Sequence, residues 1–145
     1  MFKIKFRRYT TAIIENLLSL KPTVKNQSIS IMKKNVIFTS QNDIVLVRRY
    51  SNPVEEVRKH CQVGSVVCLR RPRRPEHLLI KRLASFEGSF AGRDIPEGHC
   101  WVASDAGKGY LDSSIFGVVP LQNVIGDATF VVFPPNRIGR IPVTF

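Results

Sequence analysis

The stretch LLIKRLASF, residues 78–86, decides which fold this chain can adopt. Alternation along an extended strand would place Leu79, Lys81 and Leu83 on one face of it. An amine between two leucines loses contact with water, which favours its neutral form and lowers its pKa. The stretch therefore predicts a β-strand and makes Lys81 a candidate general base at neutral pH. The ordinary alternative is a lysine whose stem packs on apolar surface while its amine reaches water.

Short apolar runs separated by glycine and proline lie on both sides of this stretch, a pattern typical of antiparallel β proteins. They predict further strands over residues 36–38, 44–47, 63–69, 100–103, 115–119 and 128–133. A short helix is expected over residues 53–60, with Asn52 as its cap and Pro53 at its first position. The proline-broken segment 70–76, RRPRRPE, reads as a loop. The fold class is therefore mostly β, a small folded-over antiparallel domain spanning residues 36–145.

Residues 1–35 differ in composition from the rest of the chain. Residues 1–20 carry an apolar stripe of helical spacing and predict a short helix, which a polar linker follows up to residue 35. The helix begins with basic residues and has no acid before Glu15, as in a mitochondrial targeting segment. An ordinary amphipathic helix with a solvated basic end explains the same pattern equally well. Its apolar part is shorter than the roughly 20 residues that a membrane-spanning helix needs.

The chain of 145 residues carries a net charge of +11, from 22 basic and 11 acidic residues. Such a balance favours anionic partners: nucleic acid, acidic lipid headgroups or an acidic protein surface. The four arginines of segment 70–76 could contact phosphates. Because no aromatic residues are interleaved for base stacking, a solvated basic loop is the preferred interpretation, and nucleic acid binding is not expected.

Several common catalytic and metal-binding patterns are absent from the sequence. The three cysteines, Cys61, Cys68 and Cys100, form no C-x-x-C pair and are odd in number. These features argue against a disulfide framework and against a cysteine-rich zinc site. None of the three histidines accompanies a G-x-S-x-G nucleophile motif. We therefore expect no metal, no other cofactor and no Ser-His-Asp triad.

Five sequence blocks follow one another in a distinctive order. They are VGSVV (63–67), IKRL with a following EG (80–88), IPEGHCWV (95–102), SD and DS with FGVVPL (104–121), and FPPNR (133–137). In this order the blocks resemble the type I signal peptidase family, peptidase family S26, and most of all its mitochondrial inner membrane protease subunits. The resemblance covers roughly residues 43–137. It implies a signal-peptidase-like folded antiparallel β domain behind the short N-terminal helix.

The resemblance also implies an activity. Members of this family are membrane-anchored serine endopeptidases with a Ser/Lys dyad, in which a neutral lysine takes the proton of the attacking serine. Lys81 would then be the general base, and no histidine is needed. The implied role is removal of sorting peptides from proteins of the mitochondrial intermembrane space, at the inner membrane and on its intermembrane-space side. The implied partners are precursor proteins, a second protease subunit and the membrane.

The first part of the chain departs from the family's Ser-Met-x-Pro nucleophile motif. When the motif is aligned on Met32, Ile31 takes the nucleophile position, and Ser30, one residue away, is the only candidate nucleophile. Three interpretations follow. The chain is an active enzyme with a shifted serine, a catalytically inactive pseudo-protease or partner subunit, or a truncated or mis-spliced form that lacks the nucleophile.

The remaining site residues come from the strand of Lys81 and from the fourth block. Arg82, Asp112 and Ser113 are expected either to shape the site or only to hold its strand and turn. In the fourth block, Tyr110 stands where the family has a serine that hydrogen-bonds the lysine.

Overall fold

The computed structural model describes residues 34–38, 43–107 and 109–144, with the backbone alone for residues 34–38. The strands in these ranges are β1 (Lys34–Phe38), β2 (Ile44–Arg49), β3 (Val66–Arg71), β4 (Arg74–Ser85), β5 (Gly88–Phe90), β6 (Arg93–Ile95), β7 (His99–Ala103), β8 (Val119–Pro120), β9 (Val124–Phe133) and β10 (Gly139–Arg140). The helices are α3 (Pro53–His60) and α4 (Ser113–Phe116), with 3-10 turns η1 (Leu121–Asn123) and η2 (Pro135–Arg137). The expected helix over residues 1–20 and most of its linker lie outside the described residues, so the domain boundary at residue 36 stays a prediction.

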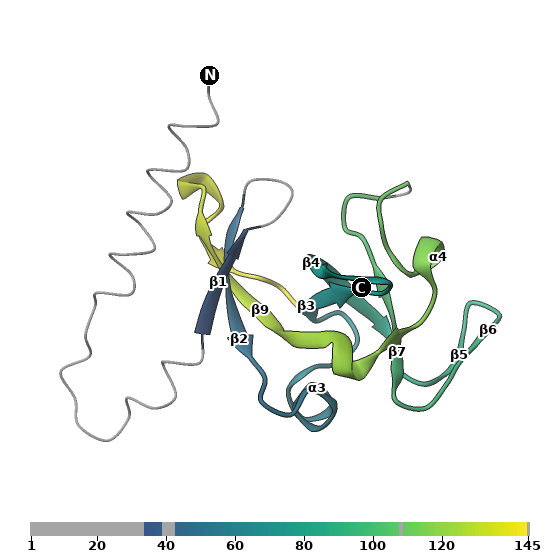
Figure 1. The fold of residues 1–145 in the computed structure, drawn as a ribbon. Helices are drawn as coiled ribbons and strands as arrows, with labels where there is room; N and C mark the ends of the chain where they lie inside the picture. Colours follow the sequence, from purple (N-terminus) through teal and green to yellow (C-terminus); the bar gives the residue numbers. More distant parts are fainter. Residues whose placement is uncertain (1–33, 39–42, 108, 145) are drawn as a thin grey trace.

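The strands form one antiparallel sheet in the order β1-β2-β9-β3-β4-β7-β8, and β10 pairs with β9. Strands β5 and β6 form a separate small hairpin. Figure 1 shows β1 and β2 on one side of the molecule, β3, β4 and β7 on the other, and the long strand β9 crossing between them. The expected mostly β, antiparallel fold is therefore confirmed.

Strand β9 can join the two halves because of Gly126. This residue pairs with Arg49 in β2 and with Cys68 in β3. A Cβ atom at position 126 would lie 2.1 Å from the carbonyl oxygen of Arg48, far inside van der Waals contact. A residue without a side chain is therefore required where β9 approaches the β2 backbone.

The core consists of two apolar clusters, one on each face of the sheet at β3. Val67 and Leu69 of β3 belong to the first cluster, which also contains Val57 of α3 and Leu83 of β4. The intervening Cys68 belongs to the second cluster, together with residues of β2 and β9. The first four residues of β3, Val66–Leu69, are thus buried on both faces, which explains why they are continuously apolar rather than alternating.

Two sequence expectations are wrong. Residues 70–76 are not a loop, because β3 and β4 continue as a hairpin whose turn is formed by Pro72 and Arg73. Arg73 has φ 65°, and a proline followed by a left-handed residue is the arrangement of a type II turn.

Residues 115–119 do not form one strand, because α4 occupies the first part of this range. The side chain of Asp112 caps α4 by accepting a hydrogen bond from the Ser114 amide at 2.9 Å.

The other expected strands are present with shifted ends. Strand β3 begins at Val66 because the chain turns at Gly64, whose φ of +95° suits glycine. Helix α3 has the expected bounds, and Asn52 is its N-cap. Within the part of the chain that the structure describes, no helix is long and apolar enough to cross a membrane.

Candidate functional site

Lys81 lies in β4 directly opposite Val67 of β3, on the face that also carries Leu79 and Leu83. Its side chain is half-buried. Loss of water lowers the pKa of Lys81 below its ordinary value of 10.5, while the carboxylates of Asp112 and Asp105 oppose that change. The direction is the one that a lysine base requires, because only the neutral amine can take a proton.

Ser104 is the side chain that Lys81 contacts. The Lys81 Nζ donates a hydrogen bond to the Ser104 Oγ at 3.5 Å, and the amide of Ala106 donates to the same oxygen at 3.3 Å. The Ser104 amide in turn donates to the Asp112 Oδ2 at 3.1 Å. Ser104 is thus held by its neighbours, and its hydroxyl limits where the amine can point.

Sequence reasoning did not select Ser104 as a site residue. The signal available in the sequence is the pair Ser104-Asp105 of the fourth block, to which the sequence analysis assigns no role. Asp105 is likewise not among the residues predicted from the sequence to shape the site, although its carboxylate joins the ion pair described next.

Arg82, beside Lys81 in the chain, ties four segments together. It forms two hydrogen bonds to the carboxylate of Asp105, with its Nε at 2.8 Å and its Nη2 at 2.6 Å. Its Nη1 donates to the carbonyl oxygens of Gly64 at 2.7 Å and Pro142 at 2.9 Å. The arginine side chain is only 11% exposed, and the ion pair lowers the pKa of Asp105. Arg82 therefore fixes the loop that begins with Ser104.

Asp112 and Ser113 hold the other end of this loop. Asp112 caps α4 and accepts from the Ser104 amide, so one carboxylate links both ends of the loop. The hydroxyl of Ser113 is buried and accepts a hydrogen bond from the Val102 amide of β7 at 2.9 Å. The structure thus brings Lys81, Arg82 and Asp112 together around Ser104 and its loop, and Ser113 anchors that assembly to the sheet.

A cleft of about 350 Å³ opens beside these residues. Its lining includes Lys81, Ser104, Tyr110 and the Arg82–Asp105 pair, together with branched apolar side chains, Val45, Val66, Ile80, Val131 and Ile141. Because a half-buried amine lines this cleft, the arrangement can accept a proton from a hydroxyl brought into it.

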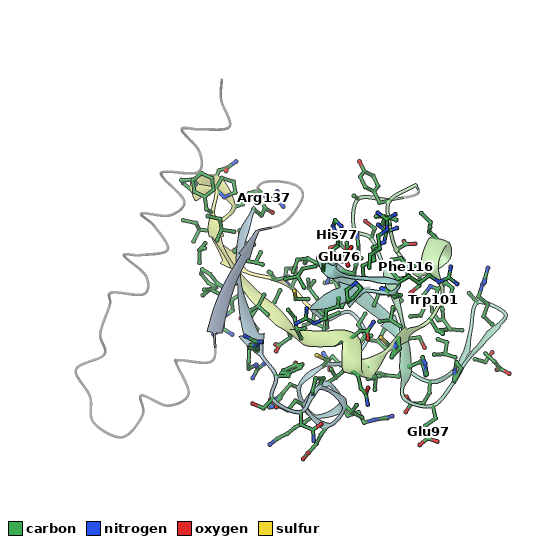
Figure 2. All side chains as sticks on the ribbon, in the orientation of Figure 1. Glu76, His77, Glu97, Trp101, Phe116 and Arg137 are labelled. Carbon is green, nitrogen blue, oxygen red and sulfur yellow. The ribbon has the colours of Figure 1, made fainter. Side chains whose placement is uncertain are left out.

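A second ion pair, Arg137 with Asp43, also lines the cleft. Two contacts of 3.0 Å join their side chains. Figure 2 labels Arg137, at the end of β9 away from β7. Ser30 lies outside the described residues. Among the described residues, no three His, Cys, Asp or Glu side chains gather closely enough to hold a metal ion.

Comparison with known proteins gives matches over this same region. Residues 84–133 match the family described as signal peptidase, peptidase S26. The chain is 35% identical over 111 residues to mitochondrial inner membrane protease subunit 2 of Danio rerio, an alignment that covers 70% of this chain and 58% of the relative. It is 33% identical over 110 residues to the subunit 2 of Schizosaccharomyces pombe, covering 70% of this chain and 57% of the relative.

A relative from a plant matches at a similar level. The chain is 29% identical over 112 residues to the mitochondrial ATP-independent inner membrane protease subunit 1a of Arabidopsis thaliana, covering 68% of this chain and 64% of the relative. The aligned part of the chain thus spans less than two thirds of the length of these relatives.

Proposed function

Since the chain is a relative of the signal peptidases of family S26, we propose that it is a serine endopeptidase subunit that uses Lys81 as its general base. Its proposed place is the mitochondrial inner membrane, on the intermembrane-space side, beside a second protease subunit. Its proposed substrates are precursor proteins whose sorting peptides it removes. The names of the relatives support the location and the partner.

One observation carries the proposal. The lysine that matches the family's base is half-buried at a cleft, and burial lowers its pKa. An exposed lysine on the same sheet would remain protonated at neutral pH and could not act as a base. The bond from Lys81 to Ser104 gives the amine a defined direction, so Ser104 is proposed as a positioning residue.

The proposed reaction has two steps. The neutral Lys81 Nζ accepts the hydroxyl proton of the nucleophile, proposed to be Ser30, while that oxygen bonds to the scissile carbonyl carbon. Lys81 then returns the proton to the departing amine as the carbon–nitrogen bond breaks, which leaves an ester on the serine. The same amine then takes a proton from a water molecule whose oxygen bonds to the ester carbon. It gives that proton to the serine oxygen as the ester carbon–oxygen bond breaks, which releases the acid product and restores the serine.

Cleavage of a presequence-containing precursor by the purified full chain tests this proposal. Lys81→Ala should reduce the rate by about a hundred- to ten-thousand-fold, the usual loss on removing a general base. The matched control is Lys59→Ala, which removes an exposed lysine and should leave the rate unchanged. Cleavage that survives Lys81→Ala would rule out the dyad, and cleavage lost in Lys81→Ala but kept in Ser30→Ala would place the nucleophile elsewhere.

A second candidate function is that of an inactive partner subunit. The observation in its favour is Ile31, an apolar residue at the position that the family's motif gives to the nucleophile. This candidate is supported if the purified chain cleaves nothing yet assembles normally with an active second subunit. Cleavage by the chain alone would exclude it.

A further inference from the structure

Beyond the sheet, β3 and β4 continue as a two-stranded arm, defined here as residues Arg70–Leu78. Strand β3 pairs with β9 only at Val67–Leu69, and β4 pairs with β7 only at Arg82–Ser85. Past these points the two strands pair with each other alone in the described part of the chain. Every arm residue from Arg73 to Leu78 is exposed. The arm therefore presents its side chains to the surroundings on both faces.

The arm carries unopposed positive charge. Four of its residues are arginines, Arg70, Arg71, Arg73 and Arg74, and its one acid is Glu76. The Glu76 carboxylate lies 3.5 Å from the ring of its neighbour His77, and Figure 2 labels both residues near the start of β4. Elsewhere in the described residues Arg48, Arg58, Arg82 and Arg137 each pair with an acid, whereas no arginine of the arm does. The charge of the arm is thus available to an external partner.

We propose that this arm docks on an anionic phospholipid surface. Clustered basic residues are attracted to acidic headgroups, and guanidinium groups bind phosphate oxygens in pairs. The exposed Leu78, 42% accessible, adds an apolar side chain that can enter the headgroup region. The arm holds no Phe, Tyr or Trp on which a nucleic acid base could stack, which favours lipid over nucleic acid.

The arm also has a defined relation to the cleft. Lys81 pairs with Val67 and Arg74 pairs with Arg71, so the two β4 residues lie opposite positions four residues apart in β3, or about 13 Å at the usual rise per residue. An arm seated on lipid would therefore hold the cleft at a set distance from the surface. This inference rests on the proposed location at the inner membrane, but its test involves no cleavage, so either can fail without the other.

Binding of the full chain to vesicles tests the proposal, with phosphatidylcholine vesicles prepared with and without phosphatidylglycerol. The variant Arg73→Gln/Arg74→Gln should bind the anionic vesicles at least about tenfold more weakly, because each basic residue near an acidic surface contributes about fivefold. The matched control Arg49→Gln/Lys59→Gln removes two exposed charges that lie outside the arm. It should change binding less than about twofold, because salt screens remote charges.

Three results would overturn the proposal. One is an equal loss of binding in the arm variant and the control, which would indicate unspecific attraction to the whole basic chain. Another is unchanged binding in the arm variant. The third is tighter binding to single-stranded RNA than to vesicles of equal phosphate content, lost in the arm variant, which would make nucleic acid the partner.

Discussion

At the scale of single residues, the state of Lys81 results from opposing influences. Burial in the sheet favours the neutral amine, while Asp112 and Asp105 favour the ammonium. Asp112 also has a structural role, because its carboxylate caps α4 and accepts a hydrogen bond from the Ser104 amide. The site therefore retains an acid whose charge works against the base, and the structural role of that acid explains why.

Asp112→Asn should separate these two roles. Its amide oxygen can still cap α4, although its NH2 group cannot accept from the Ser104 amide. Because its charge is gone, the pKa of Lys81 should fall further. A lysine base becomes active as pH rises through its pKa, so the rising limb of any cleavage profile should move to lower pH. A carbon-13 NMR titration of the Lys81 Cε measures the shift without requiring activity.

The control for this titration is Asp94→Asn, which removes an exposed acid that does not act on Lys81. The Lys81 titration should be unchanged in this variant. If it is also unchanged in Asp112→Asn, the proposed electrostatic coupling does not exist.

At the scale of elements, the strands that carry the site were predictable and their connections were not. Alternation and β-branched residues indicate a strand whatever its neighbours in the sheet are. The sequence therefore predicts the Lys81 strand and the strand before Pro134. The hairpin turn at Pro72 was missed, because prolines and four like charges usually mark a loop. The apolar run 115–119 was misread, because its first residues complete a helical turn that begins at a side-chain cap.

Gly126→Ala tests whether β9 needs its close approach to β2. The added methyl group would overlap the Arg48 carbonyl, and relieving the overlap must separate two paired strands. We expect a loss of about 3 kcal/mol in the free energy of unfolding, measured by urea denaturation. Thr129→Ala, a partly exposed position of the same strand, should cost less than about 1 kcal/mol. Equal small losses in both variants would contradict the assigned role of Gly126.

At the scale of the whole molecule, the site depends on contacts between distant parts of the chain. Arg82 joins β4 to the turn before β3, to the loop after β7 and to the C-terminal segment at Pro142. The C-terminal segment also packs near Gly64, where a Cβ atom would lie 3.1 Å from the Thr144 backbone. The strand of the base, the loop of its positioning residue and the C-terminal segment are thus held together by one guanidinium group.

Arg82→Lys should weaken this connection although it conserves the charge. A single ammonium group cannot reproduce the paired bonds to Asp105 and the two carbonyl contacts. We expect a loss of about 2 kcal/mol in the free energy of unfolding and earlier proteolysis of the C-terminal segment. Arg49→Lys, at an exposed position, should change stability by less than about 0.5 kcal/mol.

The Arg82–Asp105 ion pair also predicts that the stability of the protein depends on pH in the acid range. The pKa of Asp105 is lowered in the folded protein. The contribution of this carboxylate to the free energy of unfolding is therefore fully present above the ordinary pKa of 3.8, and it is lost as the pH falls through the lowered pKa of the folded state. The stability difference between Arg82→Lys and the unaltered chain should therefore shrink in strong acid. A difference that is constant with pH would show that the ion pair contributes nothing.

The sequence by itself determined the antiparallel strands, the face that Lys81 shares with Leu79 and Leu83, and the resemblance to signal peptidases. These features are local patterns of alternation and short motifs, which a chain carries before it folds. Three contacts follow from the folded structure alone: Ser104 accepts a hydrogen bond from the Lys81 amine, Arg82 binds Pro142 sixty residues away, and Arg137 pairs with Asp43 across 94 residues. Such contacts arise from how strands pack, and no local pattern encodes the distance between two side chains that meet only after folding.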